Sequence, residues 1–338
     1  MKRKTLKAFG LGIGLLLATI SAQAQDVKER TLRFGFQNTA DHPVGLGLQR
    51  FGELVKEKSG GKITIRLFPG GTLGGDLQTV SALQGGTVDM TVLNTGVLAG
   101  IDKNTAILDF PYLFNSEKEA DAVVDGPAGK KLHEKLAEKG LVGLSYFENG
   151  FRQTTNSRRP IAKMEDFQGL KLRVLQLPLF IDVFKELGSN PVPLPFPEVY
   201  TALEQKVVDG QENPPNTIYF SKLHEVQKYL SLTKHVFNPQ SMLLSKKTWD
   251  RLSQDEKKLI QDAANEAAVY QRQVSRDQTT KSIELIKASG VAVNEVPAEE
   301  IERIRQKIKP ITDKYAKDID PELVQQVNAE VAKARSRN

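Results

Sequence analysis

The sequence of 338 residues contains no cysteine, a single tryptophan and only four histidines. Without cysteine the chain cannot form disulfides, thiolate zinc sites, iron–sulfur clusters or a cysteine nucleophile. The histidines form no close pair that would suit a metal ion, and we predict neither a metal site nor a cofactor. With 39% hydrophobic and 26% charged residues, the composition is that of a globular protein with one large or two medium domains.

Much of the excess positive charge lies at the N-terminus. The first 24 residues carry four basic residues and no acidic one, and their apolar run Ala8–Ile20 is shorter than the about 20 residues that span a bilayer. The segment ends in Ala22-Gln23-Ala24, so residues 1–24 are predicted to be a secretory signal peptide that exports the chain to the periplasm. Its removal leaves 43 basic against 41 acidic residues, a net charge of +2, and we predict no nucleic-acid partner.

From Thr31 onwards, short predicted strands alternate with predicted helices. Thr31–Phe36 and Lys62–Phe68 are predicted strands, because apolar and polar residues alternate in the second at period two. Pro43–Lys58 between them has helical spacing and ends just before a pair of glycines. The pattern reaches a strand at Leu141–Glu148 and restarts after Gly150. Two such sets in tandem predict an α/β fold with two lobes.

A long helical segment follows the two sets. Ser253 and Glu256 fit a capping box, and neither proline nor glycine occurs from there to Gly290. The segment is about 37 residues long, roughly 55 Å at 1.5 Å per residue, which exceeds the length of one lobe. One interpretation is a single helix that packs on both lobes. The other is two helices with a break, because Ser275–Ser282 nearly lacks large apolar residues.

No catalytic motif is complete. His133 and His224 each precede a glutamate, as in the zinc-binding motif H-E-x-x-H, but Ala137 and Lys228 stand in place of the second histidine. The nearest match to a serine-hydrolase elbow, Gly143-Leu144-Ser145, lacks the second glycine. We therefore predict that the chain is not an enzyme. A secreted hydrolase that uses unrecognised carboxylates is the alternative.

Arg173 lies in a predicted strand, Lys171–Leu175, that precedes a helix. Ligands of open α/β sheets bind beyond the carboxyl ends of strands, and the arginine fork fits a carboxylate. Position alone nevertheless favours a solvated arginine at a strand end. Position alone also favours structural roles for four other residues near turns or helix ends, namely a surface Arg152, a turn-forming Asn213, a core Phe196 and a helix-starting His42.

Four sequence blocks are typical of one family. Gly150–Ile161 reads GFRQTTNSRRPI and fits the pattern G-x-R-x-x-T-x-x-x-R-P-I, while Gly169–Val174 fits G-x-K-x-R-V. Pro195–Leu203 and Val208–Pro214 fit F-x-E-V-Y-x-A-L and V-D-G-x-E-N-P. In this order the blocks resemble the solute-binding proteins of TRAP transporters, the DctP family. The resemblance runs from about Thr31 to Ala334.

The resemblance implies an α/β, two-lobed periplasmic binding protein of a type II-like fold, with a hinge and a long helix that spans both lobes. We assign residues 25–149 and 239–274 to lobe I, and residues 150–238 and 275–338 to lobe II. The implied function is capture of a small organic acid anion in the periplasm and its delivery to a small and a large membrane permease subunit for ion-driven uptake. We expect the receptor to be a monomer.

The resemblance also implies which residues bind the ligand carboxylate. Arg173 is expected to clamp it, Arg152 to add a second contact, and Asn213 to form a hydrogen bond at the same end. Gln176 lies at a position where the family often has a polar ligand contact, and Phe196 would supply an apolar wall. Arg173, Arg152 and Asn213 form the predicted carboxylate end of the site, whereas Gln176 is expected in its polar distal part.

We assign the distal end of the site to His42, Asp76 and Gln240, and Asn94–Gly96 could also reach it. Such polar side chains favour a sugar acid, a uronate or an aldonate, over a C4-dicarboxylate. The reason is that Asp76 would repel a second carboxylate but accept hydrogen bonds from hydroxyl groups.

Overall fold

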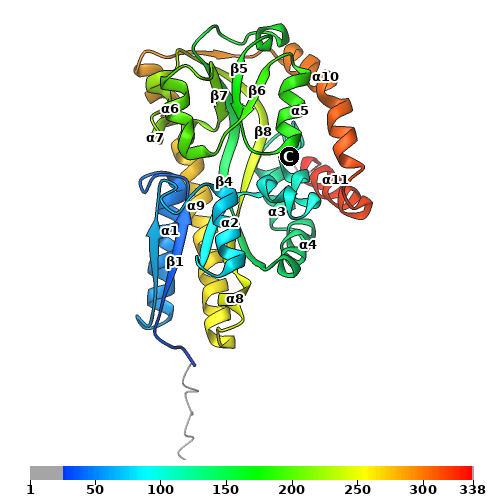
Figure 1. Ribbon diagram of the computed structural model, residues 1–338. Helices are drawn as coiled ribbons and strands as arrows, with labels where there is room; N and C mark the ends of the chain where they lie inside the picture. Colours follow the sequence, from blue (N-terminus) through cyan, green and yellow to red (C-terminus); the bar gives the residue numbers. More distant parts are fainter. Residues whose placement is uncertain (1–25, 337–338) are drawn as a thin grey trace, which may run out of the picture.

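The computed structural model describes residues 26–336, which form two lobes, the upper and lower halves of Figure 1. The predicted signal peptide, residues 1–24, lies outside the described residues. Within residues 26–336, no helix combines the length and the apolar character that crossing a membrane requires.

A single mixed sheet runs through both lobes. Its strands are β1 (Arg30–Phe36), β2 (Ile63–Phe68), β3 (Met90–Asn94), β4 (Leu141–Asn156), β5 (Lys171–Val174), β6 (Asn190–Pro193), β7 (Gly210–Asn213), β8 (Tyr229–Ser245) and β9 (Ala292–Glu295). They lie in the order β2-β1-β3-β8-β4-β7-β5-β6, and β9 pairs with the start of β8. The long antiparallel pair β4 and β8 joins a parallel group in one lobe to a parallel group in the other (Figure 1).

The two long strands depart from the sequence-based prediction. β4 was predicted to end at Glu148 but continues through Gly150 to Asn156, and β8 was not predicted. Both are almost entirely buried over long stretches, which removes the period-two alternation that reveals a half-exposed strand. The pairing register shifts between Glu148 and Gly150, and Gly150 has a φ of 108°, which an L side chain rarely adopts. Such a bulge bends a strand at the predicted junction of the lobes.

Helices cover the faces and the ends of the sheet. They are α1 (Pro43–Lys58), α2 (Asp76–Gly85), α3 (Glu117–Val124), α4 (Pro127–Leu136), α5 (Pro178–Glu186), α6 (Val199–Glu204), α7 (Pro215–Phe220), α8 (Lys246–Trp249), α9 (Gln254–Ala288), α10 (Ala298–Ala316) and α11 (Pro321–Arg335). Helix α1 has the predicted bounds and α9 begins directly after the predicted cap Ser253, because proline and capping residues define these helix starts.

The helix α9 is continuous over 35 residues, and the two-helix interpretation is wrong. Its N-terminal half places Leu259 and Ala263 in a hydrophobic cluster with α1 and β1, while Ile286 near its end packs in a second cluster with α7 and β8. It thus contributes to the cores of both lobes. Gly47 permits a close approach of α1, since a Cβ there would lie 2.5 Å from Cγ of Gln271.

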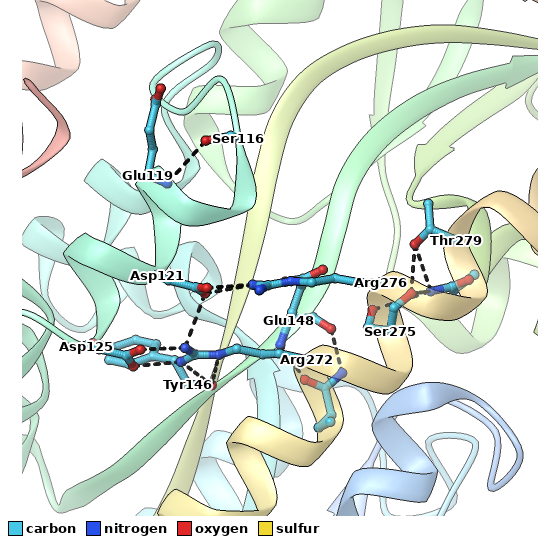
Figure 2. Close-up of polar contacts among 12 residues, drawn as sticks. Ser116, Glu119, Asp121, Asp125, Tyr146, Glu148, Arg272, Ser275, Arg276 and Thr279 are labelled. Atoms are coloured by element: carbon cyan, nitrogen blue, oxygen red, sulfur yellow. Dashed lines mark hydrogen bonds and ion pairs between the residues drawn. The ribbon is translucent and has the colours of Figure 1, made fainter. Parts of the chain in front are cut away.

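The middle of α9 is polar because it packs through hydrogen bonds and ion pairs (Figure 2). Arg272 binds Asp125 through two nitrogens at 2.6 and 2.8 Å, and Arg276 Nη2 lies 2.7 Å from Glu148 Oε2. On its other side, Asn216 of α7 donates to the Ser275 carbonyl at 2.9 Å. These partners replace the apolar residues that are missing between Ser275 and Ser282.

The C-terminal helices pack on different parts of the molecule. Residues of α10 join a hydrophobic cluster with α5, and residues of α11 join the same cluster beside α3 and α4. An ion pair of 3.0 Å between Lys135 and Asp320 adds to the α11 contact. Helix α11 therefore lies against helices that the sequence assigned to the other lobe, and the division into residues 25–149 with 239–274 and 150–238 with 275–338 stays a prediction.

Candidate ligand-binding site

A small cavity lies between the lobes, with an empty volume of about 320 Å³. Its lining residues are mostly polar: Gln37, Asn38, Asp76, Asn94, Asn149, Leu175, Phe196, Asn213, Thr217 and Gln240. Several of them directly end or follow strands β1, β3, β5 and β7. The cavity therefore occupies the position where α/β sheets bind ligands.

A larger groove lies elsewhere, between α4, β4 and the first half of α9, with an empty volume of about 1340 Å³. It is lined mainly by apolar surface and contains none of the residues that the sequence predicts for the site. The smaller cavity, with its converging polar groups, is the better candidate for a specific ligand.

Arg173 is not itself a lining residue but lies beside one, and within residues 26–336 its guanidinium has no carboxylate in direct contact. Its residue is 1% exposed, and its guanidinium carbon lies 5.9 Å from the ring centre of Phe196, which lines the cavity. Nε and Nη2 both donate to the Leu194 carbonyl at 2.9 and 2.6 Å, whereas Nη1 has no partner within residues 26–336. Burial lowers the pKa of Arg173 to about 10, and a buried cation of this kind is stabilised by an incoming carboxylate.

Arg152 is also buried, but its guanidinium is already occupied. Its Nε and Nη2 both bind the Glu212 carboxylate, the latter at 2.8 Å, and Nη1 donates to Asn238 at 3.0 Å. His235 lies 3.1 Å from the same carboxylate. Although burial raises it, Arg152 and His235 hold the pKa of Glu212 below its usual value. Arg152 does not line the cavity, so the predicted second ligand contact is here an internal ion pair.

The structure separates three further residues that the sequence predicts for the site. Asn213 and Phe196 line the cavity, whereas Gln176 is half-buried in the connection between β5 and α5 and does not. Asn213 is not in a turn, as its sequence suggested, but is the last residue of strand β7. Its neighbours Gly210 and Gln211 pair with β5, and this tertiary pairing overrides a sequence with low strand propensity.

At the predicted distal end, Asp76 and Gln240 line the cavity and His42 does not. His42 caps helix α1, because its Nδ1 accepts a hydrogen bond from the Val44 backbone N–H at 3.0 Å. Burial lowers its pKa to about 3, so the ring is neutral. Its Nε2 lies 3.3 Å from the hydroxyl of Thr217, a lining residue, so His42 is one contact removed from the cavity.

Sequence reasoning missed five lining residues: Gln37, Asn38, Asn149, Leu175 and Thr217. A signal existed for Gln37 and Asn38, which follow a correctly predicted strand at its carboxyl end. Asn149 and Thr217 carried no such signal, since their place depends on the extended β4 and on the short helix α7. Asn94, which the sequence left unranked, does line the cavity.

Comparisons with known proteins agree with this geometry. A model of the family described as bacterial extracellular solute-binding protein, family 7 (DctP), matches residues 34–318. The 2,3-diketo-L-gulonate-binding periplasmic protein YiaO of Escherichia coli (strain K12) is 36% identical over 289 residues, which are 85% of this chain and 88% of that protein.

Two solved structures are similar over nearly the whole chain. The sugar acid binding protein DctPAm of Advenella mimigardefordensis strain DPN7T, in complex with galactonate, has a TM-score of 0.89 and 45% identity, covering 91% of this chain and 100% of that one. A TRAP periplasmic solute binding protein from Ochrobactrum anthropi, with its C-terminus bound in the ligand-binding pocket, has a TM-score of 0.82 and 51% identity, covering 92% and 97%.

These similarities confirm the predicted two-lobed, type II-like α/β fold and the family resemblance. The family consists of solute-binding receptors and not of enzymes, which leaves the hydrolase alternative without support. The chain therefore belongs to family 7 of the bacterial extracellular solute-binding proteins, the DctP receptors of TRAP transporters.

Proposed function

We propose that this chain is a TRAP receptor that captures a small sugar acid, with Arg173 as the contact to the carboxylate. The observation that carries the proposal is the buried guanidinium of Arg173, which stands beside a lining residue of the polar cavity and whose Nη1 has no partner among residues 26–336. A carboxylate supplies the missing acceptor and the compensating charge in one group. Asn213 and Phe196 complete this end as a polar contact and an apolar wall.

A sugar acid fits the cavity better than a C4-dicarboxylate. The ten lining residues include no basic side chain, and the one charged group among them is Asp76. A second carboxylate would therefore lack a cation and would meet a carboxylate of the protein. The galactonate complex and the diketogulonate-binding relative support the same class of ligand.

The receptor is proposed to act in the periplasm as a monomer, after export by residues 1–24, and to deliver its ligand to the small and large TRAP permease subunits. The bulge at Gly150 and the shared helix α9 supply a hinge about which the lobes could close. Closure removes water from the carboxylate and the guanidinium, and their attraction then increases because the effective dielectric constant falls.

The test is the affinity of Arg173→Lys for sugar acids, measured by titration calorimetry on ligand-free protein. An ammonium keeps the charge but cannot form the two parallel hydrogen bonds, so we expect a loss of at least about 100-fold. The exposed Arg50→Lys is the matched control and should bind as the unmodified protein does. Unchanged affinity in a folded Arg173→Lys variant would contradict the assigned role.

A further inference from the structure

Three hydrogen-bond acceptors of the cavity lining have no donor within residues 26–336. They are Gln37 Oε1, Asp76 Oδ1 and Gln240 Oε1, and all three atoms are shielded from solvent. Asp76 and Gln37 are half-buried as residues, but the atoms in question have essentially no exposed surface. Buried acceptors without a donor are rare and costly, so three around one cavity must receive hydrogen bonds from water or from a ligand.

The two amides are held so that their oxygens, not their nitrogens, remain free. Gln37 Nε2 donates to the Gly74 carbonyl at 3.0 Å, and Gln240 Nε2 donates to Asn94 Oδ1 at 3.3 Å. Turning the Gln37 amide over would place its oxygen against the Gly74 carbonyl, so the fold fixes this acceptor. The orientation of Gln240 is set together with that of the Asn94 amide.

The acceptors and the cation come from different parts of the chain. Gln37 follows β1, Asp76 begins α2 and Gln240 lies in the second half of β8, whereas Arg173 belongs to β5. By the predicted boundaries, the three acceptors are in lobe I and the cation is in lobe II. A ligand that satisfies both sides needs an anionic group at one end and donor groups elsewhere.

We propose that Gln37, Asp76 and Gln240 read the hydroxyl groups of the ligand, and that Asp76 is the residue that excludes a second carboxylate. The inference rests on the proposed function, because it takes Arg173 as the contact of the first carboxylate. Hydroxyl groups donate to all three acceptors without bringing charge into the cavity. A carboxylate in the same place donates nothing and is repelled by Asp76.

The surroundings of Asp76 support a charged group at neutral pH. Burial raises its pKa to about 6, while Arg173 and the side chain of Gln37 act in the opposite direction. Asp76 is also the first residue of the ten-residue helix α2, where the positive end of the helix dipole favours an anion. Asp76 is therefore mostly ionised above about pH 7, and its repulsion of a second carboxylate operates in that range.

The experiment measures charge discrimination by titration calorimetry at about pH 7.5. Each aldonate of four to six carbons is paired with the aldarate that carries a second carboxylate in place of its terminal CH2OH group. Each uronate is paired with the aldarate that carries a second carboxylate in place of its aldehyde group. Hexanoate tests the need for hydroxyl groups, and 6-aminohexanoate tests whether an ammonium group serves the three acceptors better. We expect the sugar acid with one carboxylate that binds best to bind at least about 100-fold more tightly than its aldarate. We expect the same margin over hexanoate and over 6-aminohexanoate.

Asp76→Asn then tests the residue itself. Asparagine keeps an acceptor oxygen but removes the charge. The preference for the monocarboxylate over the aldarate should therefore fall at least about 10-fold, whereas the affinity for the monocarboxylate itself should fall less than about 10-fold. Gln240→Leu is the matched variant at a neutral acceptor. This substitution should lower the affinity for the monocarboxylate and for the aldarate by about 10-fold each, so that the ratio of the two affinities stays unchanged.

The outcomes separate this inference from the function on which it rests. If the protein binds an acid through Arg173 but Asp76→Asn leaves the ratio unchanged, the role of Asp76 is refuted and the receptor function stands. An aldarate, hexanoate or 6-aminohexanoate that binds as tightly as the best sugar acid refutes the hydroxyl-reading end in the same way. If no carboxylate binds, both the proposed function and this inference are wrong.

Discussion

The two buried arginines of the site region differ in their partners and not in their burial. Arg152 is 0% exposed and Arg173 is 1% exposed, and both stand in sequence blocks that resemble the same family. Arg152 is saturated by Glu212 and Asn238, whereas Arg173 holds only the Leu194 carbonyl and keeps one nitrogen free. Burial therefore identifies an unusual charge. Whether that charge stabilises the fold or can bind a ligand depends on the hydrogen-bond and ion-pair partners of the guanidinium.

The same difference separates the middle of α9 from the cavity. Arg272 and Arg276 form ion pairs with acidic residues of α3 and β4 that lie directly beside them. At the cavity, Gln37, Asp76 and Gln240 each keep an acceptor without a donor. A polar cluster whose members satisfy one another is a structural element of the hinge region, and an unsatisfied one is a binding site.

The largest expected effect comes from the same substitution at both arginines. Arg152→Met leaves the Glu212 carboxylate buried without its cation and should lower the free energy of unfolding by about 3–5 kcal/mol. Arg173→Met removes a charge that has no carboxylate in direct contact within the described residues, at the cost of two hydrogen bonds to one carbonyl, and should change this free energy by no more than about 1 kcal/mol. Denaturant titration of the ligand-free protein measures both.

A second variant controls the interpretation at Arg152. Adding Glu212→Leu to Arg152→Met removes the stranded carboxylate and should recover most of the loss. If Arg152→Met and Arg173→Met lower the free energy of unfolding equally, the proposed difference between the fully paired Arg152 and the partly unpaired Arg173 is wrong.

A smaller effect is expected at the bulge between the two regions. Gly150→Ala meets no clash, since the new Cβ would lie 3.6 Å from Pro214, but its φ of 108° should cost about 1–3 kcal/mol of unfolding free energy. Gly85→Ala, near the end of helix α2 with open space around it, is the control and should stabilise slightly. The ratio of monocarboxylate to aldarate affinity should not change in Gly150→Ala. A changed ratio would mean that the bulge also shapes the distal end.

The smallest effect concerns the pH dependence of Asp76. Its pKa is raised, chiefly by burial, from 3.8 to about 6, so lowering the pH from about 7.5 to about 5 should protonate it and narrow the discrimination against aldarates up to about 10-fold. In Asp76→Asn the discrimination should not respond to pH, while Asp109 and Glu148, with pKa values raised to about 7 mainly by burial, titrate in both proteins. Calorimetry at the two pH values compares them.

The raised pKa of Asp76 also determines how the stability of the ligand-free protein changes with pH. A carboxyl group whose pKa is higher in the folded state stabilises the protein at low pH, and that contribution is lost as the pH rises from about 4 to about 6. The ligand-free Asp76→Asn variant should therefore lose less stability than the unmodified protein over this window. An equal loss in the two proteins would show that Asp76 is not the titrating group.

Local pattern predicted much of the secondary structure. Pro43–Lys58 was predicted with the bounds that the structure has, and the capping box at Ser253 marked the start of α9. Each signal lies within a few residues of the element that it defines. β7 and β8 gave no such signal, because one is short and polar and the other is buried over most of its length.

The sequence by itself determined the two α/β sets, the single long helix and the residues that resemble a known receptor family. It could not distinguish Arg173 from Arg152, or Asp76 from His42. Those distinctions depend on partners from distant strands and helices: Glu212 for Arg152, Thr217 for the second ring nitrogen of His42, and no partner within the described residues for one nitrogen of Arg173 and one oxygen of Asp76. Whether a buried polar atom is satisfied is decided by packing across the whole chain, and only the tertiary structure contains that information.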